Sequence, residues 1–126
     1  NQIMLQALGS DTFLMSSNAI TEDGQLFNID SVANRVAALC FGPKSVVIVA
    51  GMNKIVPNLE AAYHRVRGFA SPANAQRFPI NTPCKVTGEC GDCTGTDCIC
   101  NQFVTTRLCK PAGRIKVILV GEDLGI

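Results

Sequence analysis

The sequence predicts an α/β fold in which a mostly parallel sheet packs against helices. Three apolar runs, at residues 11–16, 45–50 and 115–120, have the length of strands and are bounded by polar residues, glycine or proline. Continuous rather than alternating apolarity is typical of strands that are covered on both faces. Segments with helical patterns separate these runs, and that alternation of strand and helix indicates the α/β class.

Four segments carry helix signals. They cover residues 1–8, 31–40, 58–69 and 71–78. In the second segment, Ser31 is placed to cap the helix and Cys40 falls on its apolar side as a small core residue. The third segment is expected to stop at Gly68. The fourth pairs an N-cap Ser71 with Pro72 at the first helical position, which is a strong start signal.

One long segment interrupts the alternation. Residues 79–95 show little periodicity and contain several glycines, and a loop of this length inside a compact domain is usually functional or held by something else. Residues 101–109 are ambiguous between strand and helix. The length of 126 residues suits one core, so we predict a single α/β domain over residues 1–126 with an inserted cysteine-rich loop at 84–100.

The composition excludes several classes of partner. Eleven basic residues against ten acidic ones give a net charge of +1, which provides no electrostatic reason to expect nucleic acid or an anionic membrane. No apolar run approaches the roughly 20 residues that span a bilayer. The start of the chain lacks the basic and apolar regions of a signal peptide. We therefore expect a soluble, cytoplasmic protein.

The chain has seven cysteines, and five of them fall within residues 84–100. An odd, clustered set favours metal ligands over a disulfide framework, although a disulfide knot or a redox-active C-x-x-C remains an alternative. Cys90 and Cys93 form a C-x-x-C that directs two thiolates at one centre. Cys84 precedes this pair, and we expect only one of Cys98 and Cys100 to be a ligand. Four thiolates suit either zinc or an iron–sulfur cluster, and the spacing does not decide which.

Polar residues follow two of the predicted strands. Asn18 and Asp23 come after the first, and Asn53 and Lys54 come after the second, with Gly51 allowing close approach of backbone. Ligands of open α/β sheets gather at the carboxyl ends of strands, so these four polar residues are candidates for a site that binds a small anion. The alternative is ordinary turn chemistry, because Asn, Asp and Gly are common in turns.

Several motifs, in order, closely resemble those of the LUD family, the lactate-utilisation proteins. They are NAITEDGQLFNIDSVANRVAAL, FGPKSVVIVAGMNKIV, ANAQRFPINTPCKVTGECGDC, ICN and RIKVILVGEDLGI. The resemblance implies a Rossmann-like α/β sandwich similar to the sugar-phosphate isomerase and CoA-transferase superfamily. Members of the family are typically longer, so we expect this chain to be the C-terminal portion of the domain, a fragment without the N-terminal part.

The same resemblance implies a metal site and a role. In the subgroup with a cysteine loop, cysteines stand at the positions of Cys84, Cys90, Cys93 and Cys100, whereas Cys98 falls where arginine is common. The implied role is that of a subunit of an L-lactate oxidation system that carries a metal site, with a 4Fe-4S cluster expected and zinc as the alternative. Other subunits of the complex and a small carboxylate are the expected partners. Self-association and catalytic residues stay open.

A second hypothesis from another class is a non-catalytic binding or regulatory module whose loop holds a structural zinc ion. A third, an isomerase or acyl transferase, rests only on analogy of fold and has no matched nucleophile and base in the sequence.

Overall fold

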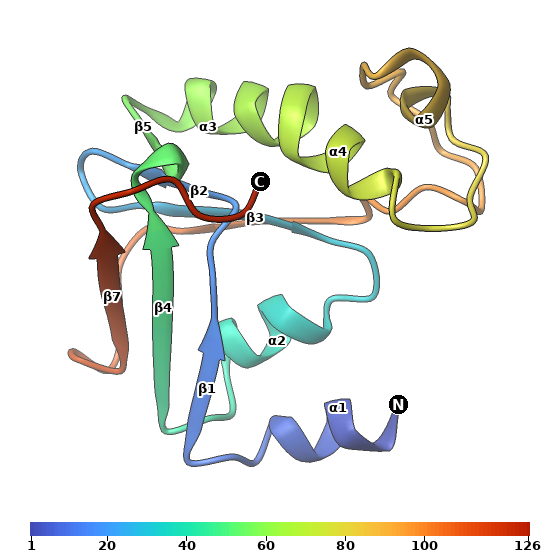
Figure 1. The fold of residues 1–126 in the computed structure, drawn as a ribbon. Helices are drawn as coiled ribbons and strands as arrows, with labels where there is room; N and C mark the ends of the chain where they lie inside the picture. Colours follow the sequence, from blue (N-terminus) through green and yellow to red (C-terminus); the bar gives the residue numbers. More distant parts are fainter.

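The computed structural model describes all 126 residues and contains two sheets (Figure 1). The first is parallel, with strand order β1-β4-β7, and consists of β1 (Thr12–Met15), β4 (Ser45–Gly51) and β7 (Ile115–Val120). The second has order β5-β2-β3-β6 and consists of β5 (Ile55–Val56), β2 (Ala19–Thr21), β3 (Leu26–Asp30) and β6 (Gln102–Thr106). In this second sheet β3 is antiparallel to both neighbours, whereas β2 and β5 run parallel. The predicted Rossmann-like α/β class is confirmed.

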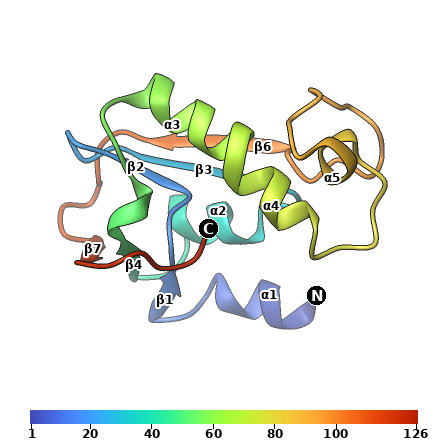
Figure 2. The same ribbon diagram turned by 45° about the horizontal axis from the view of Figure 1, so that its top comes forward.

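The helices lie on both sides of the four-stranded sheet. They are α1 (Gln2–Ala7), α2 (Asn34–Cys40), the 3-10 turn η1 (Met52–Lys54), α3 (Leu59–Arg65), the π-helical turn η2 (Val66–Ala70), α4 (Ser71–Ala75) and α5 (Pro83–Thr87). Helix α2 packs against β1 and β3. Figure 2 shows α3 and α4 crossing the other side of the four-stranded sheet as one continuous rod, with α5 beyond its end. No helix is long and apolar enough to cross a bilayer.

Two apolar clusters hold these layers together. The first joins the parallel sheet, α2 and one face of the four-stranded sheet, and contains Met15, Ile20, Leu26, Leu39, Val46, Ile48 and Ala50. The second joins the other face to the long rod, and contains Ala19, Phe27, Ile29, Val56, Ala62, Val66 and Ala70. Neighbouring residues of β2 and β3 therefore enter opposite clusters, as the alternation of side chains along a strand requires. Every residue of β3 is buried for this reason.

Several local predictions were wrong. Residues 19–30, for which the sequence predicted no strand, form the hairpin β2–β3. Ser31 does not cap α2, which begins at Asn34 with Ala33 at a positive φ of 64°. Cys40 is exposed rather than part of the core. The strands of this hairpin also pair with β5 and β6, which lie far along the chain, so local patterns did not reveal them.

The helical rod also differs from its prediction. Gly68 does not end a helix, since α3 passes through the π turn directly into α4, and Ser71 has helical φ and ψ instead of capping a new helix. The loop at 79–95 contains the short helix α5. Residues 101–109, which were ambiguous, form β6 and the turn that follows it.

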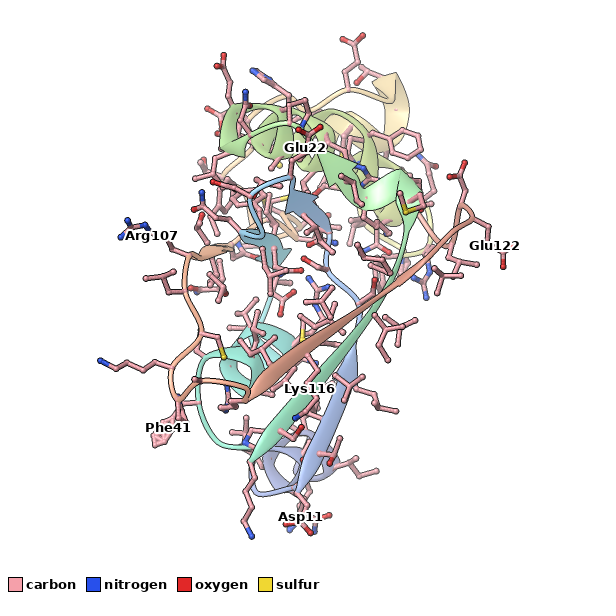
Figure 3. All side chains as sticks on the ribbon, turned by 90° about the vertical axis from the view of Figure 1, so that its left-hand side faces the viewer. Asp11, Glu22, Phe41, Arg107, Lys116 and Glu122 are labelled. Carbon is pink, nitrogen blue, oxygen red and sulfur yellow. The ribbon has the colours of Figure 1, made fainter.

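The strand β7 was expected to be covered on both faces, and this was wrong. It is an edge of the parallel sheet, and Ile118 is 50% exposed. Figure 3 views the molecule from this side, with Lys116 on the strand. One face of the parallel sheet therefore packs against α2 and the core, whereas the opposite face presents apolar side chains of all three strands to the surroundings, including Leu14 and Val49.

A buried ion pair determines where α2 begins. The carboxylate of Asp30, at the end of β3, accepts from Nε and Nη2 of Arg35 at 3.0 and 2.7 Å. Its other oxygen accepts from the backbone N–H groups of Arg35 and Val36 at 3.1 and 2.9 Å. A carboxylate in this position satisfies two of the free N–H groups of the first turn and favours the positive end of the helix dipole. Asp30 thus performs the capping predicted for Ser31.

We expect Asp30→Asn to lower the free energy of unfolding by about 3 kcal/mol, because it leaves the partly buried guanidinium of Arg35 without its carboxylate. Urea unfolding followed by circular dichroism measures this. Asp11→Asn is the matched control, since the Asp11–Lys44 pair is 3.4 Å long and its side chains are 88% and 84% exposed. An equal loss of stability in the two variants would show that the buried ion pair stabilises the fold no more than the exposed pair does.

Candidate functional site

A cavity of about 640 Å³ opens at the carboxyl ends of β1 and β4. Ser16, Ser17 and Asn18 follow β1 and line one side, and Lys54 follows β4. Three cationic side chains and one carboxylate line this cavity, namely Lys54, Arg35, Arg77 and Asp30. The predicted position of a ligand site, at the carboxyl edge of a parallel sheet, is therefore occupied by a cavity with an excess of positive charge. We refer to it as the cationic cavity.

Asn18 is held rigidly at the mouth of this cavity. Its Oδ1 accepts from the backbone N–H of Ile29 and from Nη2 of Arg35, both at 2.9 Å. Its backbone N–H donates to Oδ1 of the fully buried Asn28 at 2.9 Å, and Nδ2 of Asn28 donates in turn to Ser17 Oγ at 3.1 Å. These bonds join the end of β1 to the middle of β3. Such a hydrogen-bond network fixes side-chain positions before any ligand arrives.

Lys54 is a buried cation. The residue is only 5% exposed, and its Nζ donates to the main-chain oxygen of Ile126. Burial lowers the pKa of Lys54, and the nearby charges of Arg65 and Arg35 lower it further. A cation kept under such conditions is available to an anion that enters the cavity, because that anion would relieve both the desolvation and the repulsion.

Arg65, in α3, links two of the segments that surround the cationic cavity. Its Nε donates to the carbonyl oxygen of Asn53 at 2.9 Å and its Nη1 to that of Asn18 at 2.8 Å. Burial lowers the pKa of Arg65. The side chain ties the segment after β1 to the segment after β4, so that Asn18 and Lys54 face the same cavity. No pattern in the sequence identified this arginine as part of a site.

The structure brings together two of the four residues predicted to bind an anion, Asn18 and Lys54. Asp23 lies in the exposed turn of the β2–β3 hairpin, where its carboxylate accepts from Thr21 Oγ1 and from Gln25 Nε2. Asn53 points toward the segment after β7, with Nδ2 donating to the carbonyl of Gly125 at 3.2 Å. Neither of these two side chains lines the cationic cavity.

Gly51 does allow a close approach of backbone, as predicted, but the approaching group is the chain itself. A Cβ at this position would lie 2.5 Å from the backbone nitrogen of Leu124 and 2.6 Å from the carbonyl oxygen of Glu122. The glycine therefore lets the segment after β7 cross the end of β4. Two lining residues, Arg35 and Arg77, were missed, because neither follows a strand in the sequence.

A second cavity, of about 160 Å³, lies between α5, the segment that follows it and the start of α4. All five clustered cysteines line it: Cys84, Cys90, Cys93, Cys98 and Cys100. The remaining two, Cys40 and Cys109, are elsewhere in the fold. We call this second space the thiol cavity. The predicted cysteine loop thus folds around a common interior that all five cysteines line, and no disulfide joins them.

The thiols surround the cavity without converging on a point. No three side chains of His, Cys, Asp or Glu form a group that could hold one metal ion. The thiols influence one another: a hydrogen bond with Cys98, followed by burial, raises the pKa of Cys93 to about 11. Burial is also the main reason that the pKa of Cys100 is raised. At neutral pH these two groups are protonated thiols, and a metal that binds them must displace protons.

Arg67 places a positive charge against the thiol cavity. Its Nη2 donates to Cys90 Sγ at 2.9 Å and to Asp92 Oδ1 at 2.8 Å. The guanidinium lies over the rings of Tyr63 and Phe103, 5.3 and 5.5 Å from their centroids. These hydrogen bonds, with that of Asp92 foremost, raise the pKa of Arg67. The side chain is only 17% exposed.

The fold and these two cavities define an α/β domain with a cation-lined ligand cavity and a separate cluster of cysteines. The chain belongs to the LUD domain family, whose model matches residues 1–120. This confirms the resemblance seen in the sequence and places the chain in a family related to lactate utilisation. No curated protein and no solved structure matches the chain.

We expect Lys54→Met to stabilise the ligand-free protein by about 1 kcal/mol at pH 7, because it removes a cation that is destabilised by burial and by the charges of Arg65 and Arg35. The advantage of the variant should shrink as the pH rises toward 10.5, the ordinary pKa of lysine. The pKa of Lys54 is lower in the folded state than in the unfolded state, so between these two pKa values the unfolded state binds more protons. The stability of the unmodified chain therefore rises with pH over this range.

Urea midpoints of both proteins at pH 7 and pH 10 measure this difference, and comparing them cancels the titration of other groups. Lys44→Met, at an exposed lysine, is the control and should show no such pH dependence. A loss of stability in Lys54→Met that is constant with pH would mean that the Lys54 charge is well compensated in the fold.

Proposed function

We propose that this chain is a subunit of an L-lactate oxidation system and carries an iron–sulfur cluster in the thiol cavity. The ligands would be Cys84, Cys90, Cys93 and Cys100. The observation that carries the proposal is that the clustered cysteines all line one small cavity. Membership of a family related to lactate utilisation supports the role in an organic-acid oxidation system.

The donor set is of a kind that either an iron–sulfur cluster or a structural zinc ion uses, because thiolates are the usual ligands of both. A 4Fe-4S cluster would attach each of four thiolates to a different iron. Five thiols line the cavity, so four are available for such a cluster. When bound, the cluster would supply one-electron transfer.

The protein's own residues would support such a cluster. A cluster with four thiolates has net negative charge, and the guanidinium of Arg67, held against Cys90, would offset part of it. Cys98 would be the fifth, non-ligating thiol. Cys98 also contacts Cys93, so it is the alternative to Cys100 as the fourth ligand of the cluster. The variants described below decide between Cys98 and Cys100.

The cationic cavity would bind the organic acid. Its lining has three cations against one carboxylate, and that carboxylate is already engaged by Arg35. Lys54 and Arg77 are therefore the charges left for a carboxylate ligand, with Asn18 at the mouth. Asp23 and Asn53 are not part of this proposal, because their side chains bond elsewhere. A volume of 640 Å³ is in the range of ordinary ligand pockets, so lactate would fill only the end near Lys54.

Metal analysis of protein purified without oxygen tests the cluster. We expect near-stoichiometric iron and acid-labile sulfide and a broad absorbance near about 400 nm, typical of thiolate-bound iron–sulfur clusters. Cys93→Ser should remove most of the iron, whereas Cys40→Ser, at an exposed cysteine outside the cavity, should retain it. Comparison of Cys98→Ser with Cys100→Ser identifies the fourth ligand.

One zinc ion in a colourless protein would replace the proposal with the alternative, a binding or regulatory module with a structural zinc loop. Neither metal under reducing, anaerobic conditions would exclude both.

Titration calorimetry with L-lactate tests whether the cationic cavity binds the organic acid. Lys54→Met and Arg77→Ala should each weaken binding by about tenfold, because a charge-assisted hydrogen bond to a carboxylate contributes more than 1 kcal/mol. Lys44→Met leaves the cavity intact and should not change the affinity. The affinity of the unmodified chain should also fall with rising pH as Lys54, whose pKa is lowered, loses its charge. Equal affinities in all variants would place the acid elsewhere.

A further inference from the structure

The strand β7 gives the parallel sheet an edge that no other strand of the fold covers. It pairs with β4 on one side and stands last in the order β1-β4-β7. Three consecutive apolar residues of this strand, Val117, Ile118 and Leu119, are 42%, 50% and 49% exposed. Figure 3 looks onto the strand, with Lys116 near its start and Glu122 just past its end. An exposed apolar edge of this kind is a template for pairing with a further strand.

The backbone bonds of β7 show which of its residues have free groups at this edge. The carbonyl of Arg114 accepts from the N–H of Val46, in β4, at 2.9 Å, so the even-numbered residues face β4. Successive residues of a strand direct their N–H and C=O groups to opposite sides, so the odd-numbered residues face outward. The first of these, Ile115, already donates to the sulfur of a cysteine in the preceding turn at 3.3 Å. The free groups are therefore those of Val117 and Leu119.

The charges at the two ends of β7 select the partner. Lys116 and Glu122 are both exposed, and both have even numbers, so they lie on the same face of the sheet. A lysine on an edge strand discourages pairing with another strand unless an acidic group lies opposite it. A second copy of the same chain, running antiparallel, supplies that group twice, because the two-fold axis brings each lysine to the glutamate of the other copy. A parallel copy in register would instead place lysine against lysine.

We propose that two copies of this chain associate through β7, paired antiparallel and centred on Leu119. In this register Leu119 exchanges two hydrogen bonds with Leu119 of the second copy, and Val117 exchanges two with Gly121. Only outward-facing residues take part, so the bonds between β7 and β4 stay intact. The same register places Lys116 directly opposite Glu122. The free backbone groups and the charges thus lead to one register by separate arguments.

The neighbouring register satisfies fewer groups. Centred on Ile118, the pairing would require the N–H of Ile115, which is already used, and would place Lys116 opposite Val120. In the proposed register, Ile118 lies opposite Val120 on the open face, and the parallel sheet continues from one copy into the other. No residue of β7 lines either cavity, so this inference does not depend on the proposed function.

Light scattering of the unmodified chain over a dilution series tests the association, and we expect a dimer at high protein concentration. Lys116→Glu and Glu122→Lys should each raise the dissociation constant of the dimer by about tenfold, because each turns two attractions across the axis into two repulsions. The double variant, with both substitutions, has opposite charges again and should restore the dimer.

Glu22→Lys is the matched control for Glu122→Lys, since it makes the same change of charge at an exposed position in the β2–β3 hairpin. It should leave the dissociation constant unchanged. A monomer at every concentration would overturn the proposal. So would a double variant that associates no better than the two single ones, because the lysine and the glutamate would then not lie opposite each other.

Amide hydrogen exchange tests the backbone register directly. In the dimer the N–H groups of Val117 and Leu119 should be protected, and both dilution and Lys116→Glu should make them exchange faster. The N–H of Ile118 faces β4 and should stay protected in both states. A dimer in which Val117 and Leu119 exchange freely would mean that the interface lies elsewhere. Protection of both amides in a monomer would mean that another segment of the chain covers the edge, and either result would overturn the proposal.

Discussion

The ion pair between Asp30 and Arg35, with Asn18 attached to it, is the interaction on which the rest of this structure depends. Asp30 ends β3, Arg35 lies in the first turn of α2, and Asn18 follows β1, so one polar network joins elements of both sheets and the helix between them. Burying it is costly unless every group is paired, and its members are paired with one another and with backbone. The mouth of the cationic cavity is thereby fixed by the same bonds that hold the layers together.

The parts of the fold that could be predicted are those whose signal is local. The apolar runs of β1, β4 and β7 and the α/β class follow from patterns within a few residues. The strand β3 could not be recognised in this way, because its Asn28 and Asp30 look like loop residues. Asn28 is fully buried only because Ser17 and Asn18, about ten positions earlier, supply its hydrogen bonds. Such a partnership is visible only after the hairpin has formed.

The two candidate sites also differ in how far local sequence patterns reveal them. The sequence predicted a cluster of cysteines because all five come from one stretch of seventeen residues, and the fold brings all five to one cavity; that they bind a metal stays a prediction. The cationic cavity was predicted in part. Position after a strand identified Asn18 and Lys54, but the same rule selected Asn53, which the 3-10 turn directs away from its neighbour. Arg67 was missed because its environment requires Phe103, from a strand 36 positions further along the chain.

The long rod of α3, the π turn and α4 explains how the two sites come to share a wall. An α-helix advances by about 100° per residue, and a π turn accommodates one extra residue, so everything after it is rotated by about that angle relative to an uninterrupted helix. Before the turn, Arg65 faces the segments after β1 and β4. Within it, Arg67 reaches Cys90, and after it Ser71 lines both cavities. With the rotation that the π turn adds, the rod therefore contributes side chains to both cavities, and Ser71 lines both of them.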